Sequence, residues 1–85
     1  MLRITSIPSA NGRQRIKVEG RLAGEFVAEL SRVTETALEE SGLVMVDLAD
    51  VTFVDHSGAL LLRSLRAAGV ELVDCSQFVQ TMMLD

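Results

Sequence analysis

A chain of 85 residues has room for one small domain over residues 1–85, which is expected to bury only about 60% of the surface that the unfolded chain exposes. Apolar residues make up 48% of the composition, enough for a core, while aromatic residues make up 4%, which argues against stacking on nucleic-acid bases. The net charge of −4 with eight basic residues also disfavours nucleic acid as a partner. Residues 1–21 nevertheless hold five basic side chains against one acidic, so this end could meet an acidic partner.

The types of residue in the sequence argue against a disulfide, a metal or cofactor site, and a membrane location. Cys75 is the sole cysteine, so no intrachain disulfide or cysteine-cluster metal site can form, and it is predicted to be a small core residue. One histidine and isolated glycines match neither a zinc pattern nor a phosphate-binding loop, so no metal or cofactor is expected. No signal peptide and no apolar run long enough for a membrane span are recognisable, which predicts a cytoplasmic protein without membrane insertion.

The first 22 residues predict an antiparallel hairpin. Apolar and polar residues alternate over 2–5 and again over 15–19, with Asn11-Gly12 as the turn signal. The inward-facing residues of the second strand are predicted to be Ile16, Val18 and Leu22. Its charged residues point the other way, which is typical of a half-solvated edge strand.

An amphipathic helix is predicted over residues 24–41, ending at Gly42, because apolar residues recur at helical spacing opposite an acidic stripe. This stripe is interpreted as a solvated face, although it could also be a docking surface. Residues 43–54 are almost continuously apolar apart from Ala49-Asp50, and they predict a strand, a turn and a second strand. The lack of alternation indicates strands that are central in the sheet or covered on both faces.

The C-terminal third predicts a second helix over 57–68, stopped by Gly69, then a strand over 70–75 and a short helix over 76–84. The apolar stripe of the second helix is predicted to contain Leu61, Leu62, Leu65 and Ala68. Ser76 is expected to cap the last helix. Its Phe78, Val79, Met82 and Met83 could fill the core or make a sticky contact, and core filling is the favoured interpretation.

Asp55, His56, Ser57 and Gly58 lie where the buried strand meets the second helix. The first three are the residue types of a catalytic triad, but consecutive side chains diverge and cannot normally place a base against a nucleophile, so no enzyme is predicted. Ser57 at the helix start can cap the helix with its oxygen or carry a phosphate that the helix N-terminus stabilises. Asp55 could bind backbone donors in the tight connection.

The segment Val46-Asp47-Leu48-Ala49-Asp50-Val51-Thr52-Phe53-Val54-Asp55-His56-Ser57-Gly58 resembles the signature of the STAS family, the sulfate-transporter and anti-sigma-factor-antagonist domains. The order of elements agrees over residues 14–84. The resemblance implies an α/β fold with a mixed sheet of about four to five strands, an N-terminal antiparallel hairpin, central parallel strands and two to three packed helices.

In bacterial anti-sigma-factor antagonists of this family, a kinase-type anti-sigma factor phosphorylates the serine that precedes the glycine, and its match here is Ser57. The resemblance thus implies a non-enzymatic regulatory domain that binds a protein partner through Asp55, His56, Ser57 and Gly58, with phosphate blocking the contact. Two other functions stay open. One is a constitutive accessory subunit of a transporter or ATPase complex, and the other is a nucleotide-binding module at the same helix terminus.

This sequence departs from the family pattern at three places. His56 stands where a small residue is usual, the second helix is about one turn shorter, and the sequence ends at Asp85 where typical members continue. The missing cover would leave Met82, Met83 and Leu84 exposed unless they pack against another chain, so a homo-oligomer through this end is an arrangement to test.

Overall fold

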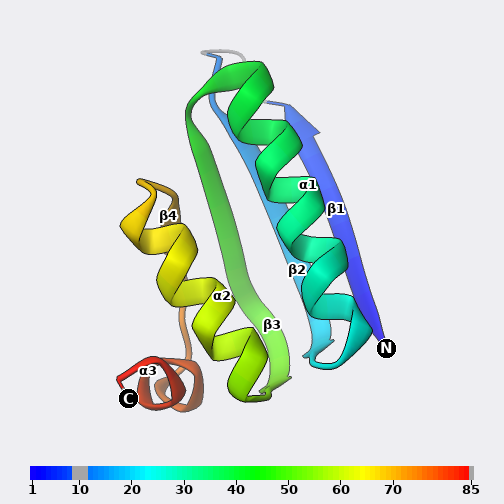
Figure 1. Cartoon of the computed structure of the whole chain (residues 1–85), viewed down its shortest axis with the longest axis vertical. Helices are drawn as coiled ribbons and strands as arrows, with labels where there is room; N and C mark the ends of the chain where they lie inside the picture. Colours follow the sequence, from blue (N-terminus) through cyan, green and yellow to red (C-terminus); the bar gives the residue numbers. More distant parts are fainter. Residues whose placement is uncertain (9–11, 85) are drawn as a thin grey trace.

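The structure is a computed structural model that describes residues 1–8 and 12–84, and in these residues four strands form one sheet with three helices beside it (Figure 1). The strands are β1 (Leu2–Pro8), β2 (Gln14–Leu22), β3 (Val44–Val54) and β4 (Glu71–Val73). The helices are α1 (Glu25–Ser41), α2 (His56–Ala67) and α3 (Gln77–Met83). This architecture confirms the predicted α/β fold with a mixed sheet.

The sheet has the order β1-β2-β3-β4, with β1 antiparallel to β2 and the other two pairs parallel. The predicted hairpin is therefore confirmed, although Asn11 of its turn signal lies outside the described residues. The prediction that the second strand is an edge strand is wrong, because β2 pairs with both β1 and β3. Its alternating pattern arises from one solvated face of the sheet, and such alternation does not distinguish an edge strand from an internal one.

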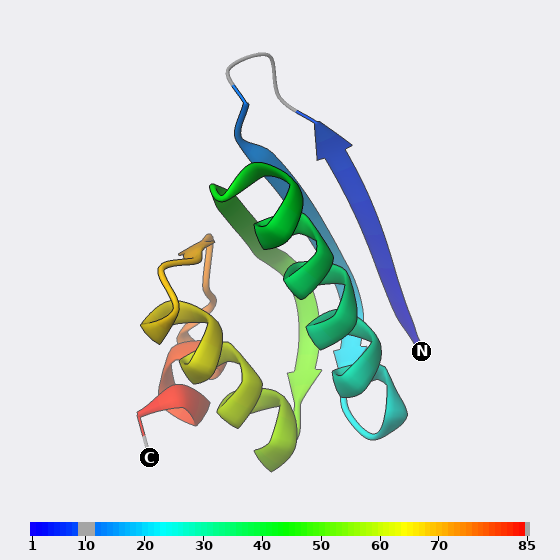
Figure 2. The same ribbon diagram turned by 45° about the horizontal axis from the view of Figure 1, so that its top comes forward.

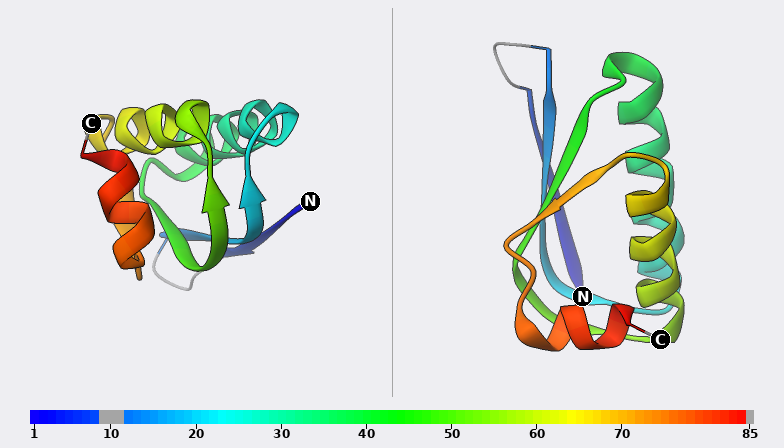
Figure 3. Two further views of the ribbon diagram at one scale, coloured as in Figure 1. Left: turned by 90° about the horizontal axis from the view of Figure 1, so that it is seen from below. Right: turned by 90° about the vertical axis from the view of Figure 1, so that its left-hand side faces the viewer.

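The helices lie on one side of the sheet. Figures 2 and 3 show α1 and α2 side by side over one face, with α3 across one end, and no helix of the described chain covers the opposite face. The core lies between the sheet and α1 and α2. Its buried apolar residues are Ile16, Val18, Leu22, Leu30, Ala37, Val44, Val46, Leu48, Val51, Val54, Ala59, Leu62, Leu65, Val70, Val79 and Met83.

Strand β3 runs without a break through Ala49 and Asp50, so the predicted turn at these residues is wrong. The pairing shows how these two exposed residues are accommodated in the strand. Lys17 lies opposite Asp47 and Glu19 opposite Asp50, so β3 carries one extra residue over this stretch. The extra residue forms a β-bulge, so the chain stays in the sheet. The interruption of the apolar run at this point therefore marks a bulge and not a turn.

The helix boundaries follow the predicted stop signals closely. Gly42 ends α1 with a left-handed φ of 75°, as expected for a glycine after the last helical turn. Helix α2 ends at Ala67, before Gly69, and the side chain of Ser76 caps α3 by accepting a hydrogen bond from the Val79 N–H at 3.2 Å. The predicted strand over 70–75 is shorter, because only Glu71–Val73 pair with β3.

The apolar C-terminal residues are divided between core and surface. Val79 and Met83 are buried and Met82 is half-buried, which confirms core filling for Met83, whereas Leu84 is 85% exposed. The expectation that all of Met82, Met83 and Leu84 lie exposed is therefore wrong for Met83. Cys75 is half-buried against the core. None of the described helices combines the length and apolar character needed to cross a membrane.

Candidate functional site

The candidate site lies at the edge of the sheet where two parallel strands pass into helices. Strand β2 ends at Leu22 and leads into α1, and β3 ends at Val54 and leads into α2 through the single residue Asp55. Because β2 and β3 are parallel neighbours, the starts of both helices lie together. The Asp55 N–H donates to the Leu22 carbonyl at 3.2 Å, which fixes the second connection against the first.

The carboxylate of Asp55 binds the starts of both helices. One of its oxygens accepts hydrogen bonds from the Gly58 N–H at 2.7 Å and from the Ser57 hydroxyl at 3.0 Å, and the other accepts from the Gly24 N–H at 3.0 Å. These donors, led by the Gly58 and Gly24 amides, lower the pKa of Asp55 below its usual value. A single charged residue therefore caps α2 and holds the residue that precedes α1.

The prediction that Ser57 caps α2 is wrong, because Asp55 is the capping residue and Ser57 is the second residue of the helix. The ionised carboxylate is the stronger acceptor for backbone N–H groups near the positive end of a helix, so it takes this position in preference to the hydroxyl. Ser57 is exposed, and its hydroxyl donates to Asp55 instead. Exposure keeps this hydroxyl accessible to a modifying enzyme.

His56 and Gly58 have different places in the site. His56 is exposed beside Ser57, in the first turn of α2. Gly58 is buried, and a Cβ atom added to it would lie 2.5 Å from the Leu22 carbonyl oxygen and 3.0 Å from Val54 Cγ1. Gly58 therefore has a packing role, since its missing side chain lets α2 approach the strand ends.

The arrangement also bears on anion binding at the start of α2. Helix N-termini bind phosphate groups through free backbone N–H groups. Here the Asp55 carboxylate already occupies the amides of Gly58 and Gly24. This disfavours a bound nucleotide phosphate at these donors. Among residues 1–8 and 12–84, no group of three or more His, Cys, Asp and Glu residues gathers in a metal-binding arrangement.

The basic residues of the N-terminal hairpin lie largely beside acidic residues of the same chain. Arg15 contacts Asp47 at 2.6 Å, Lys17 contacts Asp50 at 3.3 Å, and Arg13 lies 3.9 Å from Glu71. Asp47 is buried, and its hydrogen bond from Arg15 lowers its pKa, with a further contribution from the Ala49 N–H. The fold thus neutralises much of the positive charge that residues 1–21 show in the sequence.

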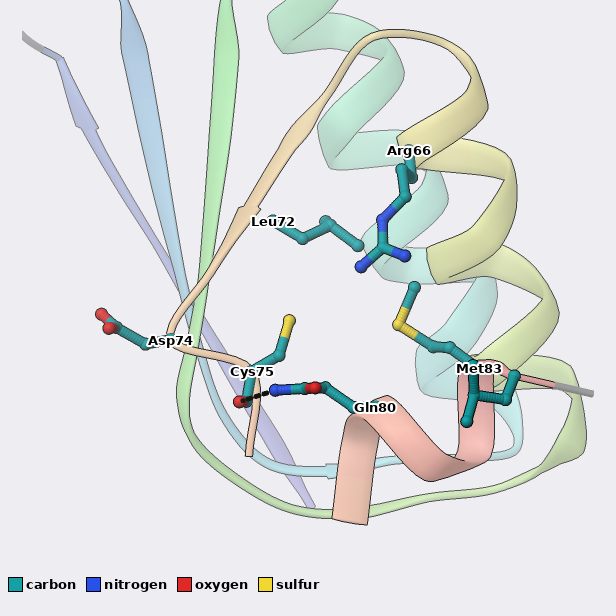
Figure 4. Close-up of a pocket in the computed structure, with 7 residues that line it drawn as sticks. Arg66, Leu72, Asp74, Cys75, Gln80 and Met83 are labelled. Atoms are coloured by element: carbon teal, nitrogen blue, oxygen red, sulfur yellow. Dashed lines mark hydrogen bonds between the residues drawn. The ribbon is translucent and has the colours of Figure 1, made fainter. Parts of the chain in front are cut away.

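Two hollows flank α3. The larger, of about 440 Å³, has Arg66, Leu72, Cys75 and Met83 among its lining residues, and Figure 4 shows the Arg66 guanidinium and the Cys75 thiol directed into it. Burial raises the pKa of the Cys75 thiol, so the reactive thiolate is scarce at neutral pH. The second hollow, of about 380 Å³, lies between α2 and α3 and is lined in part by His56.

The lowered pKa values of Asp55 and Asp47 predict a loss of stability in acid. An aspartate whose folded pKa lies below its unfolded value of about 3.9 stabilises the fold above that pH, and the contribution disappears as the pH falls through the folded pKa. We expect the free energy of unfolding, measured by urea titration, to fall between about pH 5 and pH 2. Asp55→Asn should be less stable at pH 7 and should lose less on acidification than the unmodified chain.

Glu39→Gln, on the exposed side of α1, controls for the removal of one carboxylate without touching the site. If Asp55→Asn and the unmodified chain lost equal stability over this pH range, the Asp55 hydrogen bonds would not be responsible for the acid sensitivity.

The fold is also seen in solved structures of other proteins. A STAS-domain antisigma-factor antagonist from Rhodobacter sphaeroides matches with a TM-score of 0.59 and 24% identity, over 91% of this chain and 94% of that one. A protein of the DUF3478 family with a SpoIIAA-like fold, from Shewanella loihica, matches with a TM-score of 0.58 and 16% identity, over 91% and 69%. No protein-family model and no curated protein matches the chain. The chain therefore has the STAS fold, which confirms the predicted architecture.

Proposed function

We propose that this chain is a non-enzymatic regulatory domain that binds a protein partner through the start of α2 and is switched by phosphorylation of Ser57. The observation that supports this most directly is the exposed Ser57 hydroxyl, held by Asp55 in the first turn of α2. The structural likeness to an antisigma-factor antagonist supports the same kind of action, and the partner would be a kinase-type anti-sigma factor in the cytoplasm of a bacterium.

Phosphorylation would change this surface through charge. A phosphate on Ser57 adds a charge of about −1.5 to −2, and the esterified oxygen can no longer donate its hydrogen bond to Asp55. The helix N-terminus favours the new charge, whereas the Asp55 carboxylate repels it. Because Asp55 also holds Gly24, the change reaches the start of α1 as well. A partner fitted to the unmodified surface would then meet a different charge and shape.

The contacts of Ser57 support binding over catalysis. A serine nucleophile needs an adjacent base that can take its proton, and the group that Ser57 donates to is the Asp55 carboxylate. The pKa of this carboxylate is lowered by the Gly58 and Gly24 amides, which makes it a weak proton acceptor at neutral pH. The hydroxyl is therefore better placed to receive a phosphate from a partner than to attack a substrate.

The test combines site mapping with charge variants. On incubation with a kinase-type anti-sigma factor and ATP, we expect mass spectrometry to locate one phosphate on Ser57, and none on Ser57→Ala. In titration calorimetry, Ser57→Ala should bind the partner, and Ser57→Asp should bind it at least about tenfold more weakly, a difference of about 1.4 kcal/mol.

Ser64 provides the matched control, because it is an exposed serine of α2 about two helical turns further on. Ser64→Asp adds the same charge to the same helix and should leave binding nearly unchanged. If the chain bound the kinase but carried phosphate only on residues other than Ser57, the switch would be contradicted. Equal binding of Ser57→Ala and Ser57→Asp would instead favour a constitutive subunit of a transporter or ATPase complex.

A further inference from the structure

Strand β1 has one edge without a neighbour in the sheet. The sheet order places β1 at the outside, and Figure 2 shows no other segment of the described chain beside this edge. The Arg21 N–H donates to the Met1 carbonyl at 3.0 Å, which fixes the residues of β1 that bond to β2. In an antiparallel pair, residues whose backbone groups bond to the neighbouring strand alternate with residues whose groups point away from it.

The backbone groups of alternate β1 residues therefore point in opposite directions. Since Met1 bonds to β2, so do Arg3 and Thr5, which lie opposite residues 19 and 17. Leu2, Ile4 and Ser6 direct their N–H and C=O groups away from the sheet. The free edge thus offers a row of backbone donors and acceptors, and the ligand that matches such a row is another β-strand.

This edge lacks most of the features that keep exposed strands from pairing. Charged side chains, prolines and bulges usually protect an edge strand from another chain. Within β1 only Arg3 is charged, Pro8 is the last residue, and the register with β2 runs without a shift. Residues 2–7 are therefore free to pair with a further strand.

The added strand must match both faces of the sheet. Leu2 and Ile4 lie on the helix side and are half-buried against the core, whereas Arg3 and Thr5 lie on the other side and are exposed. Strand β1 of a second copy has this same alternation. Two copies that pair antiparallel about a two-fold axis perpendicular to the sheet keep their helices on the same side, so apolar side chains continue along one face of the joined sheet.

We propose that two copies of this chain pair through β1 and form one continuous sheet, with Ile4 opposite Ile4 of the second copy and Leu2 opposite Ser6. In this register the outward N–H groups of Leu2, Ile4 and Ser6 all find carbonyl acceptors in the second copy. The interface is isologous, because each copy presents the same strand edge to the other. The proposal does not depend on the proposed function.

The neighbouring registers fit less well. With the two-fold axis at Thr5, Leu2 would lie opposite Pro8, which has no N–H to donate. With the axis at Arg3, the Arg3 side chains of the two copies would face each other directly, and like charges in that position are destabilising. The axis at Ile4 avoids both faults.

Sedimentation equilibrium from micromolar to millimolar concentration tests the pairing, and we expect the unmodified chain to pass from monomer to dimer. Ser6→Pro removes an outward N–H without removing a backbone bond to β2, so it should raise the dimer Kd at least about tenfold. Ser6→Ala is the matched control, because it keeps the N–H and should dimerise like the unmodified chain. Both variants lose the hydrogen bond from the Gln14 side chain to the Ser6 hydroxyl. Circular dichroism should show the same fold for both.

Amide hydrogen exchange identifies the surface that dimerises. The amides of Ile4 and Ser6 should exchange fast in the dilute monomer and slowly at concentrations where the dimer forms. The amides of Arg3 and Thr5 bond to β2 in either state, so their protection should change much less.

The proposal is overturned by a chain that stays monomeric at millimolar concentration or by equal dimerisation of Ser6→Pro and Ser6→Ala. It is also overturned by a dimer that protects the amides of α3 in place of Ile4 and Ser6, since this would place the contact at the C-terminal end. None of these measurements involves Ser57 or the start of α2. A failed dimer would therefore leave the proposed function intact, and failure of the Ser57 switch would leave the dimer intact.

Discussion

Replacing Leu62 with alanine is expected to lower the free energy of unfolding by about 2–5 kcal/mol. Leu62 is 0% exposed and belongs to the buried core, so the shorter side chain leaves a cavity there. A domain of 85 residues has a total stability of about 4–13 kcal/mol. The variant should therefore lose a large part of its stability, measured by urea unfolding followed with far-UV circular dichroism.

Leu60→Ala is the matched control, since it makes the same substitution two positions away in the same helix. Leu60 is half-exposed and lines the hollow between α2 and α3, so we expect its replacement to cost less than about 1 kcal/mol. The two variants therefore separate the buried face of α2, which holds Leu62, from the exposed face, which holds Leu60. Equal losses of stability would contradict this division of the helix.

The parts of the fold that sequence predicts well are those with a strong local signal. Helix α1 has apolar residues at a regular helical period and ends at a glycine, and the structure places it over Glu25–Ser41 with Gly42 in the left-handed conformation. The Ser76 cap of α3 is of the same kind, because its hydroxyl binds the N–H of Val79, three residues later. Such contacts lie within a few residues, so the sequence contains all the information that they need.

Strand β3 shows where local patterns fail. Ala49 and Asp50 interrupt an apolar run and are exposed, as turn residues are, but pairing with β2, in which Asp50 lies opposite Glu19, keeps the strand extended. The hydrogen bonds to β2 outweigh the weak preference of two residues for a turn. The contact between Arg15 and Asp47 joins residues 32 positions apart, and only the register of β2 and β3 brings them together.

The sequence predicts where β3 passes into α2, but not the hydrogen bonds within this connection. Asp55 and Ser57 are both favoured capping residues, and the sequence alone does not say where the strand ends and the helix begins. The structure decides this by the bond between the Asp55 N–H and the Leu22 carbonyl, which holds Asp55 in the extended conformation just before α2. The second contact of Asp55 is the hydrogen bond from the Gly24 N–H, which lies in the connection between β2 and α1. No pattern near Asp55 in the sequence indicates this contact.

Gly58→Ala is expected to lower the free energy of unfolding by about 1–3 kcal/mol, although alanine is normally the better helix former by about 0.5–1 kcal/mol. The added Cβ would lie 2.5 Å from the Leu22 carbonyl oxygen, a backbone atom at the end of a buried strand that cannot rotate away. Helix α2 must then move outward. This movement lengthens the hydrogen bond from the Asp55 N–H to the Leu22 carbonyl and the one from the Gly24 N–H to the Asp55 carboxylate. Urea unfolding measures the loss, and NMR shifts of Gly24 and Asp55 report the displacement.

Ser64→Ala controls for helix propensity, because Ser64 is an exposed residue of the same helix. The free energy of unfolding of this variant should stay within about 0.5 kcal/mol of that of the unmodified chain. A Gly58→Ala variant as stable as Ser64→Ala, with unshifted Gly24 and Asp55 amides, would contradict the close approach of α2 to Leu22. With the expected displacement, Gly58→Ala should also weaken partner binding although Gly58 itself is buried. The loss would arise because the same close approach that packs the core fixes Asp55, and Asp55 holds the Ser57 hydroxyl.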